Sequence, residues 1–261
     1  MNSMQNLLLD QTEVSHFTSK SQKIRVMSES WTSTEIVCAV CGSQLQRSVA
    51  NSKVLDFRCV SCVAEYELKS KAGKFTKKVT DGAYSAMITR LEASNSPHFF
   101  FMRYDMTRYA VKDFFLVPSH FLRPIAIEAR KPLSLKAKRA GWVGCNILLN
   151  QVPEIGKIDY IKDGKFIEID VVMNAWRKTS FLAESKSIIT RGWTIAVLSC
   201  VERIGHQEFT LDQMYKFEAT LAQQYPNNNF IKDKIRQQLQ VLRDQGLIEF
   251  VSRGKYRLIS N

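Results

Sequence analysis

The sequence lacks any long apolar run free of charges, although 45% of its 261 residues are hydrophobic. A helix that crosses a membrane needs about 20 consecutive apolar residues, so the composition predicts a soluble globular protein with no membrane partner. The first residues also lack a positively charged start followed by an apolar stretch, which argues against export. We therefore expect a cytoplasmic protein, in a compartment that keeps thiols reduced.

Acidic residues are scarce relative to basic ones. Aspartate and glutamate total 25 against 37 lysines and arginines, which gives a formal net charge of +12 and a pI near 9.5. This excess indicates a polyanionic partner such as nucleic acid, although ribosomal and membrane-surface proteins share it. The length allows one large domain or two modest ones.

Four of the six cysteines form two C-x-x-C pairs. Cys38 and Cys41 precede Cys59 and Cys62, with seventeen residues between the pairs. This spacing is typical of a closed, four-thiolate structural zinc site. Two disulfides are the alternative, but they require an oxidising compartment. The remaining pair, Cys145 and Cys200, have no partner at ligand spacing and are expected to be small buried hydrophobes.

The residues after the second cysteine pair alternate polar with apolar side chains. In a strand this places Glu65, Glu67 and Lys69 on one face, and Asp56 lies on an earlier strand. Phosphodiester hydrolysis needs carboxylates that hold a divalent cation and a lysine that orients or deprotonates water. Asp56 and Glu67 could bind Mg²⁺, and Lys69 could serve the water. A solvated strand face has the same pattern, so this signal alone is weak.

A basic, glycine-containing segment from 130 to 146 is suited to DNA. Lys138 and Arg139 could neutralise phosphates, and the neighbouring glycines could let Trp142 approach a groove. A core tryptophan beneath a surface loop is the alternative for Trp142. Four segments elsewhere in the first 183 residues predict a mixed sheet with helices: a helix over 21–31, a helix over 80–95, and strands over 98–103 and 114–117.

The C-terminal segment has the element order of a winged helix: a helix over 192–204, a strand near 208–211, helices over 212–224 and 230–245, and a hairpin formed by 247–251 and 255–259. The polar stretch 183–187 predicts a domain boundary. The third helix and the hairpin turn carry donors suited to phosphates and adenine edges in a major groove. They are Lys232, Lys234, Arg236, Gln237, Gln238, Gln240 and Arg253. A charge-rich solvated helix is the alternative.

Five sequence motifs follow one another along nearly the whole chain: D-F-R-C-V-S-C-V-A-E-Y-E-L-K-S-K-A-G, D-G-A-Y-S-A-M, R-A-G-W-V-G-C-N-I, R-G-W-T-I and I-R-Q-Q-L-Q-V-L-R-D. In these motifs and in their order, the chain resembles the DpnI-type methyl-directed restriction endonucleases. The resemblance implies an α/β (α+β) fold, with a PD-(D/E)xK nuclease core and embedded zinc site over 1–183 and a winged helix over 184–261.

By position, the resemblance identifies Asp56, Glu67 and Lys69 with the catalytic triplet. It identifies the cysteine pairs with the zinc ligands. Leu55 stands where the motif's name has proline, which supplies no ligand. The implied function is Mg²⁺-dependent double-strand cleavage of DNA at GATC containing N6-methyladenine, by a monomer that reads the methyl group with Trp142 and again with the winged helix. A non-enzymatic winged-helix regulator or methyl-DNA reader with a structural zinc module is the competing hypothesis.

Overall fold

The computed structural model describes residues 6–48, 55–93, 96–185 and 187–259. It divides into two compact units. The N-terminal unit comprises Met1–Asn150 and Ile155–Arg177, and the C-terminal unit comprises Gln151–Glu154 and Lys178–Asn261. Lys186, within the stretch predicted as a domain boundary, lies outside the described residues. No helix in the described part of the chain has the length and apolar character needed to cross a membrane.

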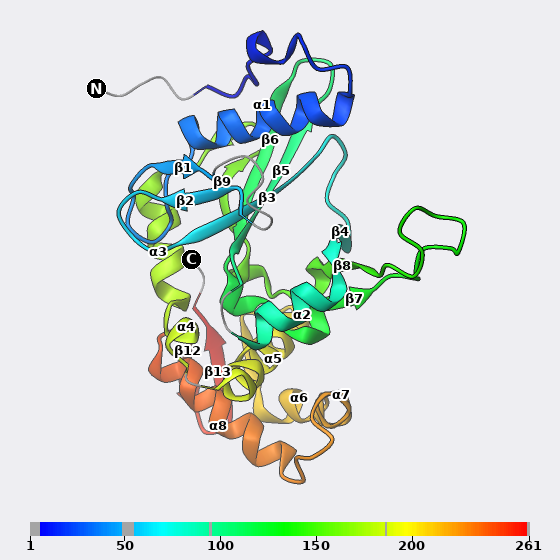
Figure 1. The fold of residues 1–261 in the computed structure, drawn as a ribbon. Helices are drawn as coiled ribbons and strands as arrows, with labels where there is room; N and C mark the ends of the chain where they lie inside the picture. The colour runs from blue at the N-terminus through cyan, green and yellow to red at the C-terminus, as the bar shows by residue number, and fades with distance from the viewer. Residues whose placement is uncertain (1–5, 49–54, 94–95, 186, 260–261) are drawn as a thin grey trace. The chain divides into compact units, whose positions relative to one another are not determined.

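The N-terminal unit is built on a seven-stranded mixed sheet with the order β1-β2-β3-β5-β6-β9-β10 (Figure 1). β3 and β5 are parallel, and the other neighbours are antiparallel. Fully buried aromatic rings from adjacent strands form its core, and Tyr66 stacks on Phe100 with ring centroids 4.6 Å apart. The strands are β1 (Leu45–Arg47), β2 (Phe57–Cys59), β3 (Glu65–Lys71), β5 (His98–Asp105), β6 (Ala110–Val117), β9 (Ile158–Lys162) and β10 (Lys165–Phe166).

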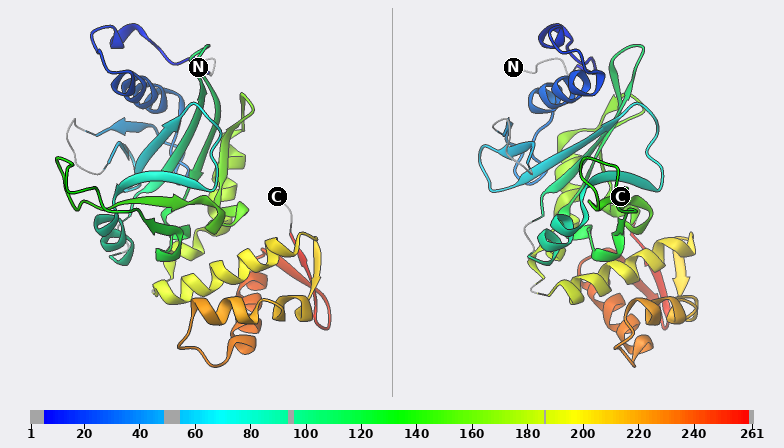
Figure 2. Two further views of the ribbon diagram at one scale, coloured as in Figure 1. Left: turned by 90° about the vertical axis from the view of Figure 1, so that its right-hand side faces the viewer. Right: turned by 45° about the vertical axis from the view of Figure 1, so that its right-hand side comes forward.

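Helix α1 (Lys20–Glu35) packs on one face of this sheet, near β1 and β3 (Figures 1 and 2). Its Trp31 lies 5.7 Å from Phe114 of β6, measured between ring centroids. The predicted helix over 21–31 and the two predicted strands are confirmed, although each element is longer than the sequence indicated. These contacts bury the apolar side of α1 against the sheet that carries the candidate site.

A smaller antiparallel sheet has the order β4-β8-β7. Its strands are β4 (Lys78–Ala83), β8 (Gly144–Leu148) and β7 (Ile127–Ala129), and helix α2 (Tyr84–Glu92) follows β4 directly. The prediction of one helix over 80–95 is therefore wrong at its start. Val79 and Thr80 are β-branched, and Gly82 disfavours a helix interior, so pairing with β8 prevails. Asn95, predicted to end that helix, lies outside the described residues.

The C-terminal unit has the winged-helix order, and its antiparallel sheet has the order β11-β13-β12. Helix α5 lies beside α8 (Figure 1). The predicted helix over 212–224 is divided into α6 and α7, with a capping box at Thr210 and Gln213 starting α6. The elements are α4 (Phe181–Glu184), α5 (Ile188–Ile204), β11 (Glu208–Thr210), α6 (Leu211–Tyr215), α7 (Glu218–Gln224), α8 (Ile231–Asp244), β12 (Ile248–Ser252) and β13 (Lys255–Leu258).

Helix α3 (Ile169–Thr179) follows β10, and several single-turn 3-10 helices lie between the larger elements. The single turns are η1 (Thr12–Val14), η2 (Ser119–Phe121), η3 (Pro124–Ala126), η4 (Leu149–Gln151) and η5 (Glu154–Gly156). The sequence predicted neither α3 nor the strands β7 to β10.

Candidate active site and DNA-binding surfaces

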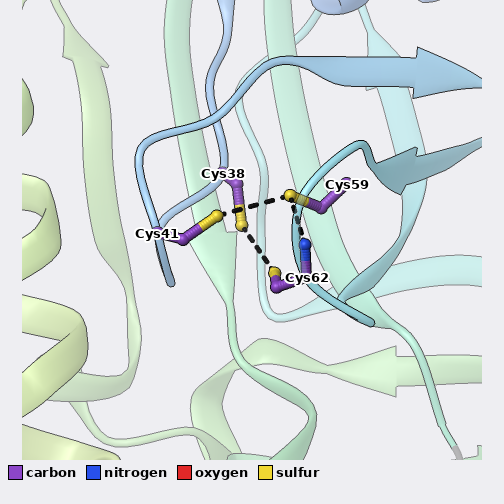
Figure 3. A group of neighbouring side chains, drawn as sticks. All are labelled: Cys38, Cys41, Cys59 and Cys62. Carbon is purple, nitrogen blue, oxygen red and sulfur yellow. Dashed lines mark hydrogen bonds between the residues drawn. The ribbon is translucent and has the colours of Figure 1, made fainter.

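Four cysteine side chains from two turns converge beside the sheet edge formed by β1 and β2 (Figure 3). The Sγ atoms of Cys38 and Cys62 lie 3.6 Å apart, those of Cys41 and Cys59 lie 3.4 Å apart, and all four lie within 4.8 Å of one another. A tetrahedral zinc site with Zn–S bonds of about 2.3 Å separates its sulfurs by about 3.8 Å. The four thiols therefore fit one zinc ion. All six cysteines are described and free, so the disulfide alternative is not realised.

The surroundings of the cysteine cluster suit thiolates. The backbone N–H groups of Ser61 and Cys62 both donate to the Cys59 sulfur, each at 3.4 Å. The Ser43 hydroxyl is the main cause that lowers the pKa of Cys41 to about 6. Burial raises the pKa of Cys38, so a cation is needed to hold this group as a thiolate at neutral pH. A zinc ion bound by all four thiolates would have no open coordination position, so its role would be structural and it would fix the turn between β2 and β3.

The three residues of the predicted catalytic triplet lie together just beyond this turn. Asp56 directly precedes β2, and its Oδ2 accepts a hydrogen bond of 2.7 Å from the N–H of Leu68. Leu68 stands on β3 between Glu67 and Lys69, whose Oε1 and Nζ atoms are 2.5 Å apart. Antiparallel pairing of β2 with β3, with Phe57 opposite Tyr66, brings the two segments together. The alternation predicted for β3 therefore produces a shared polar face.

The ionisation of these groups is governed by burial. Burial raises the pKa of the Asp56 carboxyl, although the Leu68 N–H favours its ionised form, and burial also raises the pKa of Glu67. Burial alone would lower the pKa of Lys69, but the Glu67 and Asp81 carboxylates raise it above its ordinary value. Burial makes the Asp56 and Glu67 carboxyls costly to ionise when no metal is bound. A divalent cation bound by both groups would stabilise them as carboxylates. The residues present thus fit Mg²⁺.

Asp81 is a fourth charged group at this site, and the sequence reasoning missed it. Its carboxylate forms an ion pair with the Lys69 ammonium, and the side-chain exposures of Lys69, Glu67 and Asp81 are 16%, 19% and 5%. By contrast, Glu65 on the same face of β3 pairs with the exposed Arg58 at 2.8 Å. The D-G-A-Y motif contains the residue, but its assignment to a helix gave no reason to place it beside β3.

Comparison with known families matches both units. The DpnI model, described as the Dam-replacing family, matches residues 5–185. The DpnI_C model, described as the Dam-replacing HTH domain, matches residues 189–258. The chain belongs to the DpnI family. Membership indicates a restriction endonuclease whose action depends on DNA methylation, and the HTH match indicates DNA binding. The predicted resemblance and fold class are confirmed.

In this DpnI-family chain the basic segment predicted to meet DNA is the connection between β7 and β8. Lys138 and Arg139 are exposed and Trp142 is half-buried. The Arg139 guanidinium lies 4.5 Å from the centre of the Trp142 ring. A Cβ added to Gly144 would meet the same indole at 2.8 Å, so the absence of a side chain there lets the ring pack on the backbone. The loop presents two cations beside a restrained aromatic ring.

In the HTH domain the predicted DNA-binding residues of α8 divide between surface and core. Lys232, Arg236 and Gln237 are exposed, Lys234 is half-buried with its Nζ 2.7 Å from Gln237 Oε1, and Arg253 is exposed in the β12–β13 turn. Gln238, however, is buried and accepts a 2.6 Å hydrogen bond from Thr194 of α5. The expectation that Gln238 could face DNA is therefore wrong, because it joins α8 to α5.

Phe230, immediately before α8, is a further candidate for DNA contact that the sequence analysis did not identify. Its side chain is 71% exposed, whereas Ile231 and Ile235, which follow it, are buried. In helix-turn-helix proteins the first residues of the recognition helix are the ones that contact base edges. The sequence contained a signal for Phe230. It is an apolar residue at the predicted start of this helix, and it falls outside the periodic stripe of apolar residues that α8 buries.

Proposed function

We propose that this protein is a type II restriction endonuclease that hydrolyses both strands of DNA at GATC containing N6-methyladenine, with Mg²⁺ as its catalytic cofactor and Zn²⁺ in a structural role. The observation that carries the proposal is the shared position of Asp56, Glu67 and Lys69, joined through the Leu68 N–H and the Glu67–Lys69 ion pair. Family membership supports the same reaction class.

The residues of this site divide the work of hydrolysis. Asp56 and Glu67 would hold Mg²⁺, which when bound supplies Lewis-acid polarisation of the scissile phosphate. The Lys69 ammonium, two residues along the same face, would orient the attacking water and stabilise the negative charge that develops on phosphate oxygens. The four cysteines take no part in the reaction and fix the turn between the two carboxylate-bearing segments.

Exposed cations on both units would bind the DNA backbone. Lys138 and Arg139 in the β7–β8 connection, with Lys232 and Arg236 on α8, are suited to phosphates, as is the half-buried Lys234, and Arg253 in the wing turn is suited to a flanking phosphate. Gln237 is suited to an adenine edge in the major groove. Neutralisation of several phosphates would make affinity for any duplex fall steeply with salt, so methyl preference must be compared at one salt concentration.

The methyl group would be read by apolar surface. N6-methylation replaces an amino hydrogen of adenine with a methyl in the major groove, and aromatic rings provide favourable contact for such a group. Trp142 in the N-terminal unit and Phe230 before α8 are the two aromatic candidates. In palindromic GATC the modified adenines occupy neighbouring base pairs on opposite strands, so one ring could touch both methyl groups.

A plasmid cleavage assay tests the proposal. Plasmid methylated at GATC should be linearised in Mg²⁺ and left intact in EDTA, and the same plasmid without methylation should be cut far more slowly. No cleavage of the methylated plasmid in Mg²⁺, with specific binding retained, would instead support the non-enzymatic reader. Equal cleavage of both plasmids would reject methyl dependence.

We also infer a cytoplasmic monomer. Cysteines that bind zinc must be reduced, and none of the described cysteines forms a disulfide, which is what a reducing compartment maintains. Two DNA-binding surfaces in one chain remove the need for a second copy to read the site. Sedimentation of the protein with and without a methylated duplex tests the stoichiometry, for which we expect one chain on each duplex.

A further inference from the structure

Asp81 is nearly inaccessible yet has no place in the catalytic triplet. Its carboxylate pairs with the Lys69 ammonium, although the two residues come from different sheets: Lys69 lies on β3 of the seven-stranded sheet and Asp81 on β4 of the three-stranded sheet. Burial of a carboxylate costs free energy that an ion pair only partly offsets. An aspartate at this position therefore calls for an explanation in the site it faces.

The Asp81 carboxylate is fixed by its own strand. Asp81 Oδ1 accepts a 2.7 Å hydrogen bond from the N–H of Gly82. The residue stands opposite Cys145 in the β4–β8 ladder, and the N–H of Tyr84, just after β4, donates to the carbonyl of Val143 at 3.0 Å. Because β4 is paired with β8 both before and after Asp81, its backbone is fixed, and the carboxylate is a well-placed partner for a flexible lysine side chain.

The Lys69 ammonium has two carboxylates and one aromatic ring as neighbours. It pairs with Glu67 at 2.5 Å and with Asp81, and the centre of the Phe99 ring is 5.7 Å from Nζ. Of these, Glu67 would also serve as a metal ligand, so its oxygens cannot be committed to Lys69 alone. If Asp56, Glu67 and Asp81 are all ionised, three negative charges and the one positive charge of Lys69 give a net charge of −2. One divalent cation would balance this charge.

We propose that Asp81 is a positioning residue that holds the Lys69 ammonium in place while Glu67 is engaged at the metal. The inference rests on the proposed function of Lys69 and adds to it the group that orients this lysine. Asp81 itself touches neither phosphate nor metal. Without the Asp81 carboxylate, Lys69 has only Glu67 as an anionic partner, and Glu67 would be engaged at the metal. A misplaced ammonium then orients the attacking water poorly, which slows the reaction without weakening DNA binding.

Kinetics of the full chain separate this role from a general structural one. Asp81→Asn keeps the size of the side chain and an acceptor for Gly82 while it removes the charge. We expect the single-turnover cleavage rate on a methylated duplex to fall about 10- to 100-fold, with the duplex Kd in Ca²⁺ unchanged. The matched control is Glu128→Gln, because Glu128 lies on β7 of the same sheet and pairs with Lys78 of β4 at 2.6 Å. It should leave the rate within about twofold.

A magnesium titration distinguishes positioning from ligation. If Asp81 positions Lys69, the slow rate of Asp81→Asn persists at saturating Mg²⁺ and the half-saturating Mg²⁺ concentration stays near that of the native protein. Recovery of the native rate at high Mg²⁺ would overturn the proposal, because it would make Asp81 a metal ligand. An undiminished rate at all Mg²⁺ concentrations would overturn it as well.

A thermal cycle tests the ion pair without any assay of cleavage. In metal-free protein, Asp81→Asn should lower the Tm when Lys69 is present, because the pair is lost. In a Lys69→Met background the same substitution should raise the Tm, because it relieves two uncompensated carboxylates at Glu67 and Asp81. The same sign in both backgrounds would overturn the proposed pairing. If Lys69→Met cleaves DNA as fast as native protein, the proposed function of Lys69 fails, while the thermal cycle still reports on Asp81.

Discussion

The candidate active site and the recognition helix α8 hold charged side chains in opposite ways. At the candidate active site in the N-terminal unit, the Lys69 side chain is 16% exposed and its ammonium pairs with two carboxylates. In the C-terminal unit Lys232 and Arg236 on α8 are 53% and 55% exposed, and their acidic partners, Glu218 and Asp233, are exposed as well. Exposed ion pairs contribute little to stability and exchange partners easily, which suits side chains that must turn to phosphates. Buried charges are retained at a cost, which suits groups that must stay in place for chemistry.

The largest effect is expected from loss of the zinc site, which should destabilise the N-terminal unit and leave the C-terminal unit intact. Cys59→Ser should lower the zinc content and the thermal stability of the N-terminal unit and abolish cleavage, since structural zinc contributes on the order of 10 kcal/mol in small domains. Cys200→Ser, in buried α5 and outside the cluster, is the control and should keep one zinc per chain. Native protein purified without chelator that contains no zinc would contradict the assignment.

The next largest effect concerns the carboxylates of the triplet. Asp56→Ala and Glu67→Ala should each reduce single-turnover cleavage by about a thousandfold or more, because the ligands for the metal are lost, while binding to methylated duplex in Ca²⁺ stays close to native. Glu65→Ala is the control, because Glu65 lies on the same face of β3 but pairs with Arg58 and not with Lys69. This variant should be mild, and a severe loss of cleavage from it would show that the wrong carboxylate had been assigned.

A smaller effect is expected at the recognition surface. Phe230→Ala should reduce the preference of the protein for methylated over unmethylated GATC duplex about fivefold, because one aromatic contact is worth about 1 kcal/mol. Titration of both duplexes at fixed salt measures the ratio. Phe250→Ala is the matched control, since Phe250 is another exposed ring of the same unit, on β12 of the wing. If both variants lower the ratio equally, the position before α8 has no special role.

The smallest effect is a pH dependence of stability in the metal-free protein. Burial raises the pKa values of Asp56 and Glu67 above their ordinary values of 3.8 and 4.5. The folded state then binds more protons than the unfolded state, so stability falls as the pH rises through this range and above it. Mg²⁺ should reverse the loss and raise the Tm by about 2–4 °C per kcal/mol. A metal-free Tm that rises with pH in native protein but not in Glu67→Gln would show that Glu67 ionises readily.

The local sequence pattern was sufficient to predict an element where residues close together in the chain determine it. The alternation from Glu65 to Lys69 predicted β3 and its polar face, and the C-x-x-C spacing predicted the thiol cluster, because both depend on short separations along the chain. The winged-helix order could likewise be read from helix ends and a glycine turn at 254. The predicted roles of Asp56, Glu67 and Lys69 in catalysis remain predictions.

Long-range pairing explains what the sequence could not predict. β4 owes its strand conformation to β8, more than 60 residues later, so Asp81 was placed on a helix instead of beside Lys69. Gln238 resembled a surface donor until α5 supplied Thr194 as its partner. For both Asp81 and Gln238 the deciding neighbour is distant in the chain, where periodicity carries no information.

The account separates DNA cleavage, at the site of Lys69, from recognition of methylated GATC. The most direct test of this separation is one paired measurement on Lys69→Met. Single-turnover cleavage in Mg²⁺ and the ratio of Kd values for methylated and unmethylated GATC duplex in Ca²⁺ are determined on the same preparation at one salt concentration. The account predicts cleavage below detection with a native methyl preference. Cleavage at the native rate would contradict the assignment of Lys69, and loss of the methyl preference would contradict the separation of chemistry from recognition.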